Sequence, residues 1–186
     1  MRIIAGRYKG RRLATVRGSI RPTSDRLRES LFSILGESVR DSTWLDLFAG
    51  TGAIGLEALS RGARSVLFND RDAEAIVLIE KNLTLCGVEE GCEVRSEDAI
   101  VLLRRLSDQP PYDFIALDPP YDYRQYRKLL DKLSKSPLCG PQTTIVLEVF
   151  KKRAEGIVPP GLGVRRSIVG GDSLQFLLRR VDPEEG

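Results

Sequence analysis

The 186-residue chain contains no histidine. Catalytic triads built on Ser-His-Asp or Cys-His, and zinc sites that use histidine, are therefore excluded in their usual form. The cysteines are Cys86, Cys92 and Cys139, an odd number with no C-x-x-C spacing. This usage is typical of a reducing compartment and argues against a disulfide framework or a four-cysteine metal site. Catalysis by this chain must use carboxylates, backbone groups, aromatic side chains or a bound cofactor, and we expect no metal.

Long apolar runs are also missing. No segment approaches the roughly 18 apolar residues that a membrane span requires, and residues 1–7 lack the apolar core of a signal peptide. We therefore expect a cytoplasmic protein without a membrane partner. The length predicts one compact domain with a short arm.

Charge is distributed unevenly along the chain. Residues 1–28 carry nine basic side chains against the single acid Asp25, a net charge of +8, whereas the remaining 158 residues carry −5. Arginine suits bidentate contacts with phosphate, so nucleic acid is the expected partner of this arm; a solvated basic face is the alternative. The candidate RNA contacts are the basic residues Arg2, Arg7, Lys9, Arg11, Arg12 and Arg21.

Strand-like and helix-like segments alternate through most of the chain. We predict strands at 44–48, 65–68, 92–95, 114–117 and 144–149, with helices at 54–61, 73–86, 99–106 and 123–134. Before them come a short hairpin of strands 3–5 and 12–14 and a helix, capped by Thr23 or Ser24, that ends near Gly36. Strands 164–169 and 174–180 follow without a helix between them. This order predicts an α/β, Rossmann-like fold: a mostly parallel seven-stranded sheet closed by an antiparallel C-terminal hairpin.

The predicted organisation is a basic hairpin arm over 1–20, a main domain over 21–182 and a tail over 183–186. In an open α/β sheet the ligand crevice lies at the carboxyl ends of the central strands. The candidate site residues follow those strand ends.

A glycine turn follows the first main strand. It reads Asp46-Leu47-Phe48-Ala49-Gly50-Thr51-Gly52-Ala53-Ile54-Gly55, and its glycines allow a ligand to approach the backbone. Its glycine spacing also matches the dinucleotide fingerprint G-x-G-x-x-G, so a nicotinamide cofactor remains an alternative. Asp46, however, can hold a cationic amine, which a pyrophosphate lacks. The cofactor candidates here are Asp46, Phe48, Ala49, Gly50 and Gly52.

Acidic residues also follow the next two strands. Asp70, beside Arg71, can accept hydrogen bonds from a ribose diol, and Asp98, beside Ala99, can accept from an adenine amine. Acceptors for ammonium, ribose and adenine at successive strand ends predict S-adenosylmethionine as the cofactor. Asp72 is interpreted as a helix cap.

The sequence Asp118-Pro119-Pro120-Tyr121 ends the fourth main strand. Its prolines force a stiff exit from the sheet. Asp118 and the Pro119 carbonyl can then accept hydrogen bonds from an exocyclic base amine and aim its lone pair at a methyl donor, while Tyr121 stacks on the base. These residues, Pro120 included, are the candidate catalytic residues.

With these motifs the sequence resembles class I S-adenosylmethionine-dependent amino-methyltransferases. The segments 2–13, 21–32, 55–63 and 171–173 are similar to the bacterial 16S ribosomal RNA guanine-N2 methyltransferases of the RsmD type. The resemblance implies that Thr23 lies near the methionine part of the cofactor, that Asp70 holds the ribose and that residues 118–121 hold the guanine. It also implies 16S rRNA in a small-subunit assembly intermediate as substrate, and a monomeric enzyme. The chain departs from the family pattern with Asp70, where Glu is frequent, and with Ser173, where Thr is frequent.

The sequence is also compatible with other functions. The motif at 118–121 does not separate guanine from adenine, so an adenine-N6 DNA or RNA methyltransferase is one alternative. A catalytically silent RNA-binding assembly factor is another, and a nicotinamide-dependent oxidoreductase is a third. A cytosine-C5 enzyme is disfavoured because no Pro-Cys pair supplies a nucleophile.

Overall fold

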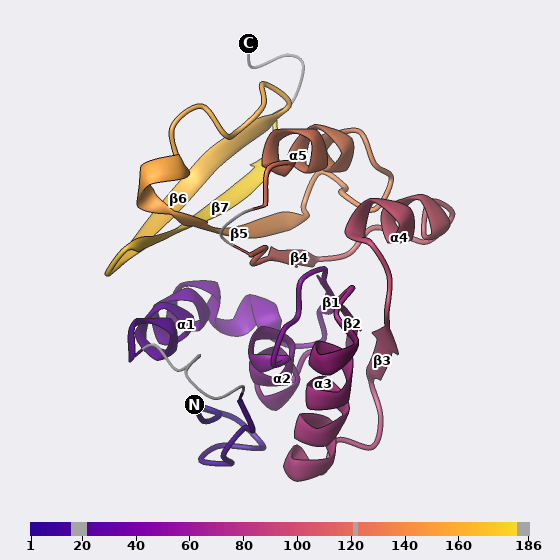
Figure 1. Cartoon of the computed structure of the whole chain (residues 1–186), viewed down its shortest axis with the longest axis vertical. Helices are drawn as coiled ribbons and strands as arrows, with labels where there is room; N and C mark the ends of the chain where they lie inside the picture. Colours follow the sequence, from indigo (N-terminus) through magenta and orange to yellow (C-terminus); the bar gives the residue numbers. More distant parts are fainter. Residues whose placement is uncertain (16–21, 121–122, 182–186) are drawn as a thin grey trace.

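The computed structural model describes residues 1–15, 22–120 and 123–181, except for the side chains of residues 22–24. Within this part seven strands form one sheet, in the order β3-β2-β1-β4-β5-β7-β6 (Figure 1). The strands are β1 (Thr43–Asp46), β2 (Ser65–Asn69), β3 (Cys92–Arg95), β4 (Phe114–Leu117), β5 (Thr144–Phe150), β6 (Leu162–Gly170) and β7 (Ser173–Arg180). The helices are α1 (Pro22–Leu35), α2 (Ala53–Ser60), α3 (Ala73–Cys86), α4 (Ala99–Arg105) and α5 (Tyr126–Ser134), with 3-10 turns η1 (Gly36–Val39) and η2 (Lys151–Arg153).

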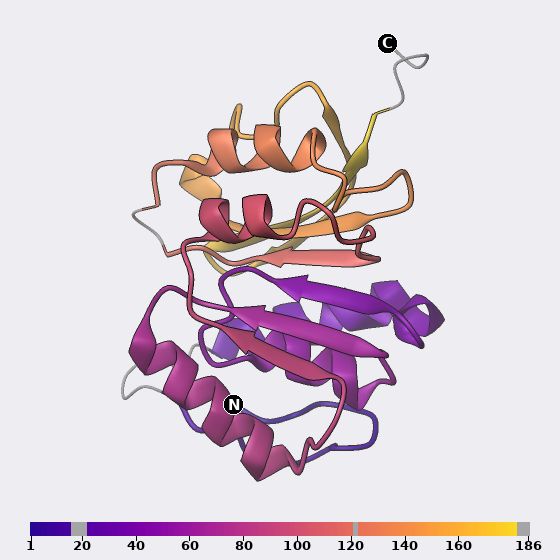
Figure 2. The same cartoon turned by 90° about the vertical axis from the view of Figure 1, so that its right-hand side faces the viewer.

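The first five strands are parallel, whereas β7 pairs antiparallel with both β5 and β6. Figure 2 shows β1, β2 and β4 pointing the same way, with helices on both sides of the sheet. The predicted Rossmann-like fold, with an antiparallel hairpin at its C-terminal end, is confirmed.

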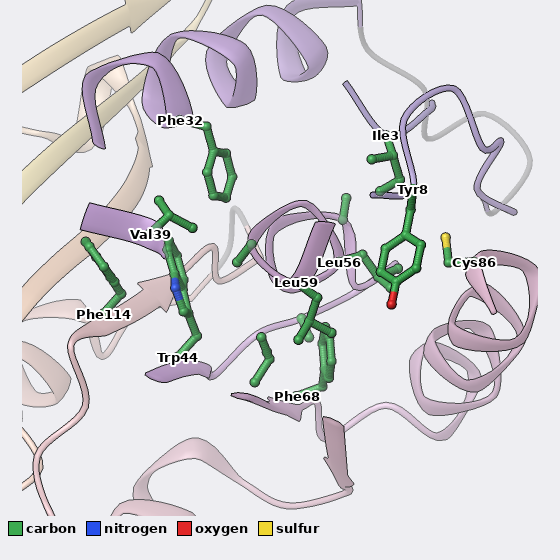
Figure 3. Close-up of a cluster of buried hydrophobic side chains, with 14 of the residues drawn as sticks. Ile3, Tyr8, Phe32, Val39, Trp44, Leu56, Leu59, Phe68, Cys86 and Phe114 are labelled. Atoms are coloured by element: carbon green, nitrogen blue, oxygen red, sulfur yellow. The ribbon is translucent and has the colours of Figure 1, made fainter. Parts of the chain in front are cut away.

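Side chains point alternately to the two faces of the sheet along each strand, and they form one hydrophobic core on each face. Trp44, Phe114, Val146 and Leu177 belong to the core that α1, α2 and α3 cover, whereas their chain neighbours belong to the core under α4 and α5. The Trp44 ring stacks on Phe114, with ring centroids 4.4 Å apart, and on Phe32 at 5.6 Å (Figure 3). This burial on both faces explains why the central strands are short apolar runs.

Several elements start one to three residues away from the predicted position, and for two of them the structure shows the physical reason. Helix α1 begins at Pro22, where a proline without an N–H fits the first helical position, so Thr23 and Ser24 lie in the first turn and the predicted capping is wrong. Helix α5 begins at Tyr126 instead of residue 123, because the Tyr123 amide donates to the Pro120 carbonyl (2.9 Å) and closes a turn first.

The first 14 residues are more closely packed than a free arm. The predicted two-stranded pairing is reduced to one antiparallel bridge, between Arg2 and Arg12. Ile3, Tyr8 and Leu13 are nevertheless buried in the core on the side of α1 to α3, and Figure 3 shows Tyr8 facing Leu56, Leu59 and Cys86. The exposed basic residues of the arm therefore belong to a segment whose apolar side chains are part of the core.

Buried polar groups of α2 and α3 attach this segment. Glu57, which has no exposed surface, accepts hydrogen bonds from the amides of Ile4 (2.8 Å) and Ala5 (3.1 Å). Ser60 accepts from the Tyr8 amide (2.9 Å), and the Asn82 side chain exchanges hydrogen bonds with the backbone of Ala14. These groups replace the backbone pairing that a longer hairpin would supply.

No helix in the described ranges is long and apolar enough to cross a membrane. The described residues also contain no group of three Cys, Asp or Glu side chains that could hold a metal ion.

Candidate active site

The candidate site lies at the carboxyl edge of the sheet. Strand order reverses between β1 and β4: β1 leads through β2 to β3 on one side, and β4 leads to β5 on the other. A crevice at such a switch point is where open α/β sheets bind their ligands. The predicted residues around 46–52 and 118–120 come from these two neighbouring strands.

Asp46 is the last residue of β1 and is only 2% exposed. Its Oδ2 is buried and has no hydrogen-bond partner among the described residues. Burial raises the pKa of this carboxyl from 3.8 to about 7; a backbone hydrogen bond from Gly55 lowers it and the charge of Asp70 raises it. A buried, unpaired acceptor of this kind is suited to a cationic ligand group, which would replace the proton.

The glycine turn after Asp46 is shaped for backbone contact with a ligand. Gly50 and Gly52 have φ values of 54° and 75°, a region that glycine enters without steric cost. A Cβ on Gly50 would meet no described atom within 4 Å, so the space beside the turn is open. A Cβ on Gly55 would lie 2.3 Å from Phe68, which shows that this third glycine serves close packing of α2 on β2.

Asp70, at the end of β2, is bound to the turn. One carboxylate oxygen accepts from the Gly50 amide (2.9 Å) and the other from the Asp72 amide (3.0 Å). An ionised carboxylate has further lone pairs, so it can still accept from a diol. Arg71 beside it is exposed.

Asn69 links the strand ends, a role that the sequence interpretation missed. Its amide donates to the carbonyls of Leu47 (3.1 Å) and Glu97 (3.0 Å), and its carbonyl accepts from the Glu97 amide (3.1 Å). The side chain has no exposed surface. The ends of β1, β2 and β3 are thereby held in a fixed relation, and an amide at the end of a buried strand was the signal.

Asp98 is the N-cap of α4, where its Oδ1 accepts from the amides of Ile100 (2.9 Å) and Val101 (3.2 Å). Neither of these hydrogen bonds uses its Oδ2. Asp98 is exposed, whereas Ala99 is buried at the start of α4. The predicted contact with adenine therefore falls to Oδ2 alone. Asp72 caps α3 by accepting from the Glu74 amide (3.0 Å), as predicted.

An aromatic wall adjoins this end of the site. Phe48 contacts Tyr123 edge to face at 5.3 Å, and Tyr123 contacts Tyr126 in the same way at 5.3 Å. Burial raises the pKa of Tyr123, the charge of Asp98 also raises it, and Arg71 lowers it. Tyr123, which the sequence interpretation placed in a helix, thus lies near Asp98 and Arg71 and joins β1 to the exit of β4.

Asp118 and Pro119 follow β4 directly. Asp118 is exposed and Pro119 is buried, whereas Pro120 is exposed and its carbonyl closes the turn with Tyr123. Tyr121, Arg21 and the side chain of Thr23 lie outside the described residues.

The basic side chains of the arm are exposed at Arg2, Arg7, Lys9, Arg11 and Arg12. Arg11 donates to the Cys86 carbonyl and lies over the Tyr8 ring, 5.3 Å from its centroid. The turn at 6–10 contacts Ser60, the last residue of α2, so it lies toward the amino edge of the sheet (Figure 2). Arg2 and Arg12 are therefore nearer to the candidate site than Arg7 and Lys9.

Another basic cluster was missed. Lys151, Lys152 and Arg153 form η2 directly after β5 and are all exposed at the carboxyl edge. The Lys151 amide donates to the Asp172 carbonyl (2.9 Å), which ties this turn to the β6–β7 hairpin. The signal was present in the sequence, because this is the only run of three consecutive basic residues in the chain.

Comparisons with known proteins agree with this architecture. The family model described as conserved hypothetical protein 95 matches residues 1–177. A Haemophilus influenzae protein named ribosomal RNA small subunit methyltransferase D is 36% identical over 155 residues, which cover 82% of this chain and 80% of the relative.

Solved structures show the same fold. The structure named "Putative methyltransferase yhhF from Escherichia coli" superposes with a TM-score of 0.84 at 29% identity, over 97% of each chain. A protein named SMU.776, solved in complex with SAH, superposes with a TM-score of 0.71 at 18% identity, over 87% of this chain and 50% of that one. The second likeness concerns the fold alone. On the family model and the relative together, this chain belongs to the conserved hypothetical protein 95 family, which is the family of small-subunit ribosomal RNA methyltransferase D.

Proposed function

We propose that this protein transfers a methyl group from S-adenosylmethionine to the exocyclic N2 amine of one guanine in 16S ribosomal RNA. The observation that carries the proposal is the pairing of two sites at one sheet edge. A buried carboxylate with a free oxygen stands before an open glycine turn on β1, and the Asp118-Pro119 exit stands on the adjacent β4.

The cofactor supplies a methyl group that is bonded to a positively charged sulfur. An amine can attack this methyl group directly, with the sulfur as the leaving group. Asp46 Oδ2 is the acceptor for the ammonium of its methionine part, because it is buried and has no protein partner among the described residues. The open turn at Gly50 admits the ligand beside backbone amides, and Asp70 accepts from the ribose diol. Asp98 Oδ2 accepts from the adenine amine, next to the wall of Phe48 and Tyr123.

The base is held on the β4 side. The carboxylate of Asp118 and the carbonyl of Pro119 accept hydrogen bonds from the two N–H groups of the amine, so that its lone pair is directed at the methyl group. A nitrogen–carbon bond forms as the sulfur–carbon bond breaks, and the amine then loses a proton, which Asp118 accepts and passes to water. The two prolines restrict the turn so that these oxygens need little reordering.

RNA contacts come from the basic surface. The exposed arginines and lysine of residues 2–12 bind backbone phosphates along the side of α2 and α3, and Lys151 to Arg153 bind them at the carboxyl edge. Arg28 is excluded from this role because it is 2% exposed and donates to the Arg2 carbonyl (2.7 Å). The substrate is a partly assembled small subunit in the cytoplasm, and the enzyme acts as a monomer.

The experiment is methyl transfer from labelled S-adenosylmethionine to unmodified small subunits, naked 16S RNA and DNA, followed by nuclease digestion and nucleoside identification by mass. The proposal predicts N2-methylguanosine from a ribosomal substrate. Methyladenosine would assign the chain to the adenine-N6 enzymes. Cofactor binding without transfer to any of the three substrates would make it a silent binding factor.

RNA binding is tested by removing exposed charge instead of deleting the arm, because Ile3, Tyr8 and Leu13 belong to the core. Each lost phosphate contact lowers the slope of log affinity against log salt by about 0.7 to 0.9. The test variant carries three alanines, at Arg7, Lys9 and Arg12. The matched control carries three alanines at the amino edge, at Arg104, Lys132 and Lys135. A slope that falls by about 2 in the test variant alone supports the contact; equal slopes contradict it.

A further inference from the structure

A polar pair outside the sequence motifs lies near the carboxyl end of β4. Glu148 of β5 is directly opposite Gln175 of β7, and the Gln175 amide donates to Glu148 Oε2 at 2.8 Å. Gln175 is 2% exposed, and its Oε1 is buried without a partner among the described residues. Glu148 is only partly buried. The Glu148 carboxylate therefore lies near the surface, and the almost fully buried amide of Gln175 fixes its position through this hydrogen bond.

The sheet register places this carboxylate in the site. Leu117 pairs with Leu147 in the parallel β4–β5 ladder, so Asp118 and Glu148 are the two residues that directly follow this pair. Strand β4 ends at Leu117, whereas β5 continues to Phe150. Glu148 therefore lies one residue beyond the last β4–β5 pair.

Glu148 also shares a face with Asp46. The register aligns Asp46 with Ala116 and Ala116 with Val146, and Glu148 is two residues beyond Val146, hence on the same face. Asp46 Oδ2 and Gln175 Oε1, two of the buried oxygens without partners in the described part of the chain, thus belong to one face at one edge. Unpaired buried polar groups are costly, and a bound ligand is one way to complete their hydrogen bonding.

We propose that Glu148, held by Gln175, selects guanine by accepting a hydrogen bond from its ring N1–H. This inference rests on the proposed function, in which Asp118 and the Pro119 carbonyl hold the exocyclic amine. In guanine two ring nitrogens flank the carbon that bears this amine: N1 is a donor and N3 carries a lone pair. In adenine and cytosine the corresponding ring nitrogens carry a lone pair instead.

An ionised carboxylate is an acceptor only, so Glu148 pairs with guanine and repels the lone pair of the other two bases. Gln175 is a positioning residue: its amide engages Oε2 and directs Oε1 toward the base. Glu148 thus supplies the discrimination that Asp118 to Tyr121 lack. A site built to hydrogen-bond a ring N–H strongly disfavours an analogue without it.

The test uses 2-aminopurine, which keeps the exocyclic amine of guanine but has no hydrogen on N1. The methylated position is first mapped in the labelled small-subunit product. Small-subunit RNA carrying guanine or 2-aminopurine at that position is then assembled into particles. The wild type should methylate guanine with a kcat/KM at least about 100-fold higher than 2-aminopurine. In Glu148→Gln the rate on guanine should fall and this ratio should collapse to within about tenfold.

Glu155→Gln, an exposed change in the nearby loop, is the matched control and should keep the wild-type ratio. Gln175→Met removes the donor to Glu148 with little change of shape; it should lower the ratio and raise KM more than it lowers kcat, and it serves the same test where Glu148→Gln does not fold. A wild-type ratio retained in a folded variant overturns the inference while leaving guanine methylation intact. Absence of guanine methylation by the wild type, in contrast, refutes the proposed function itself.

Discussion

If Asp46 holds the ammonium group as proposed, its ionisation sets a pH dependence for cofactor binding. Its pKa is raised to about 7 by burial, so the carboxyl of the free enzyme is mostly protonated below neutrality. Only the ionised form can hold an ammonium group. The ionised fraction rises from about 3% at pH 5.5 to about half at pH 7.0, so the affinity for S-adenosylmethionine should rise about 15-fold over this range.

Calorimetric titration measures both the affinity and the proton that binding displaces. At pH 6 the wild type should release about 0.9 proton per cofactor bound, seen as a dependence of the apparent enthalpy on the ionisation enthalpy of the buffer. Asp46→Asn should bind more weakly, with an affinity that does not change between pH 5.5 and 7.0. Asp108→Asn, an exposed change, should behave as the wild type. A wild-type affinity independent of pH in this range would refute the assignment.

Stability should show the opposite trend in the free enzyme. The folded pKa lies above the unfolded value of 3.8, so the native state binds the proton more tightly and loses stability as pH rises from about 4 to 7. Ionisation of the buried Asp46 carboxyl lowers the free energy of unfolding by about 4 kcal/mol at most. This full loss is present above pH 7 and absent below pH 4. Urea unfolding at pH 4.5 and pH 7.5 should therefore show a larger gain for Asp46→Asn at the higher pH.

Two further substitutions test the packing that positions the site. Glu57→Ala leaves Arg61 Nε and the amides of Ile4 and Ala5 without their buried acceptor and removes the ion pair with Arg28, so we expect a loss of about 3 to 5 kcal/mol in urea unfolding; a loss below 1 kcal/mol would contradict the attachment of the arm through Glu57. Gly55→Ala places a Cβ 2.3 Å from Phe68. It should lower the free energy of unfolding by about 1 to 3 kcal/mol and weaken cofactor binding by shifting the turn. An unchanged melting temperature with unchanged affinity would show that α2 has room to move.

The main sheet was predictable because each central strand is a short apolar run buried on both faces. Helix α3 and strands β3 and β4 have the predicted bounds, since clear signals flank them, such as the cap Asp72 and the prolines after Leu117. The start of α5 was not predictable: its register follows from the hydrogen bond between Tyr123 and Pro120, which depends on how two prolines turn the chain.

The motifs place the candidate site at the carboxyl edge of the sheet but do not reveal which contacts hold its residues. Asn69 joins three strand ends, and Glu148 is hydrogen-bonded to Gln175. In the sequence each of them is a single polar residue in an otherwise apolar strand. Their partners are set by sheet order, which the sequence does not display. The sequence of the arm likewise shows only that it is basic. Its attachment to the domain depends on Glu57, Ser60 and Asn82, which are more than 40 residues away in the chain.

The most direct test of the central claim joins the reaction to the site in one assay. Labelled S-adenosylmethionine is incubated with unmodified small subunits and either the wild type, Asp118→Ala or the control Asp108→Ala, and the digested RNA is analysed by mass while cofactor affinity is measured separately. We expect N2-methylguanosine from the wild type and the control, and a rate at least about 100-fold lower from Asp118→Ala with cofactor affinity retained. N2-methylguanosine formed at the wild-type rate by Asp118→Ala would contradict it.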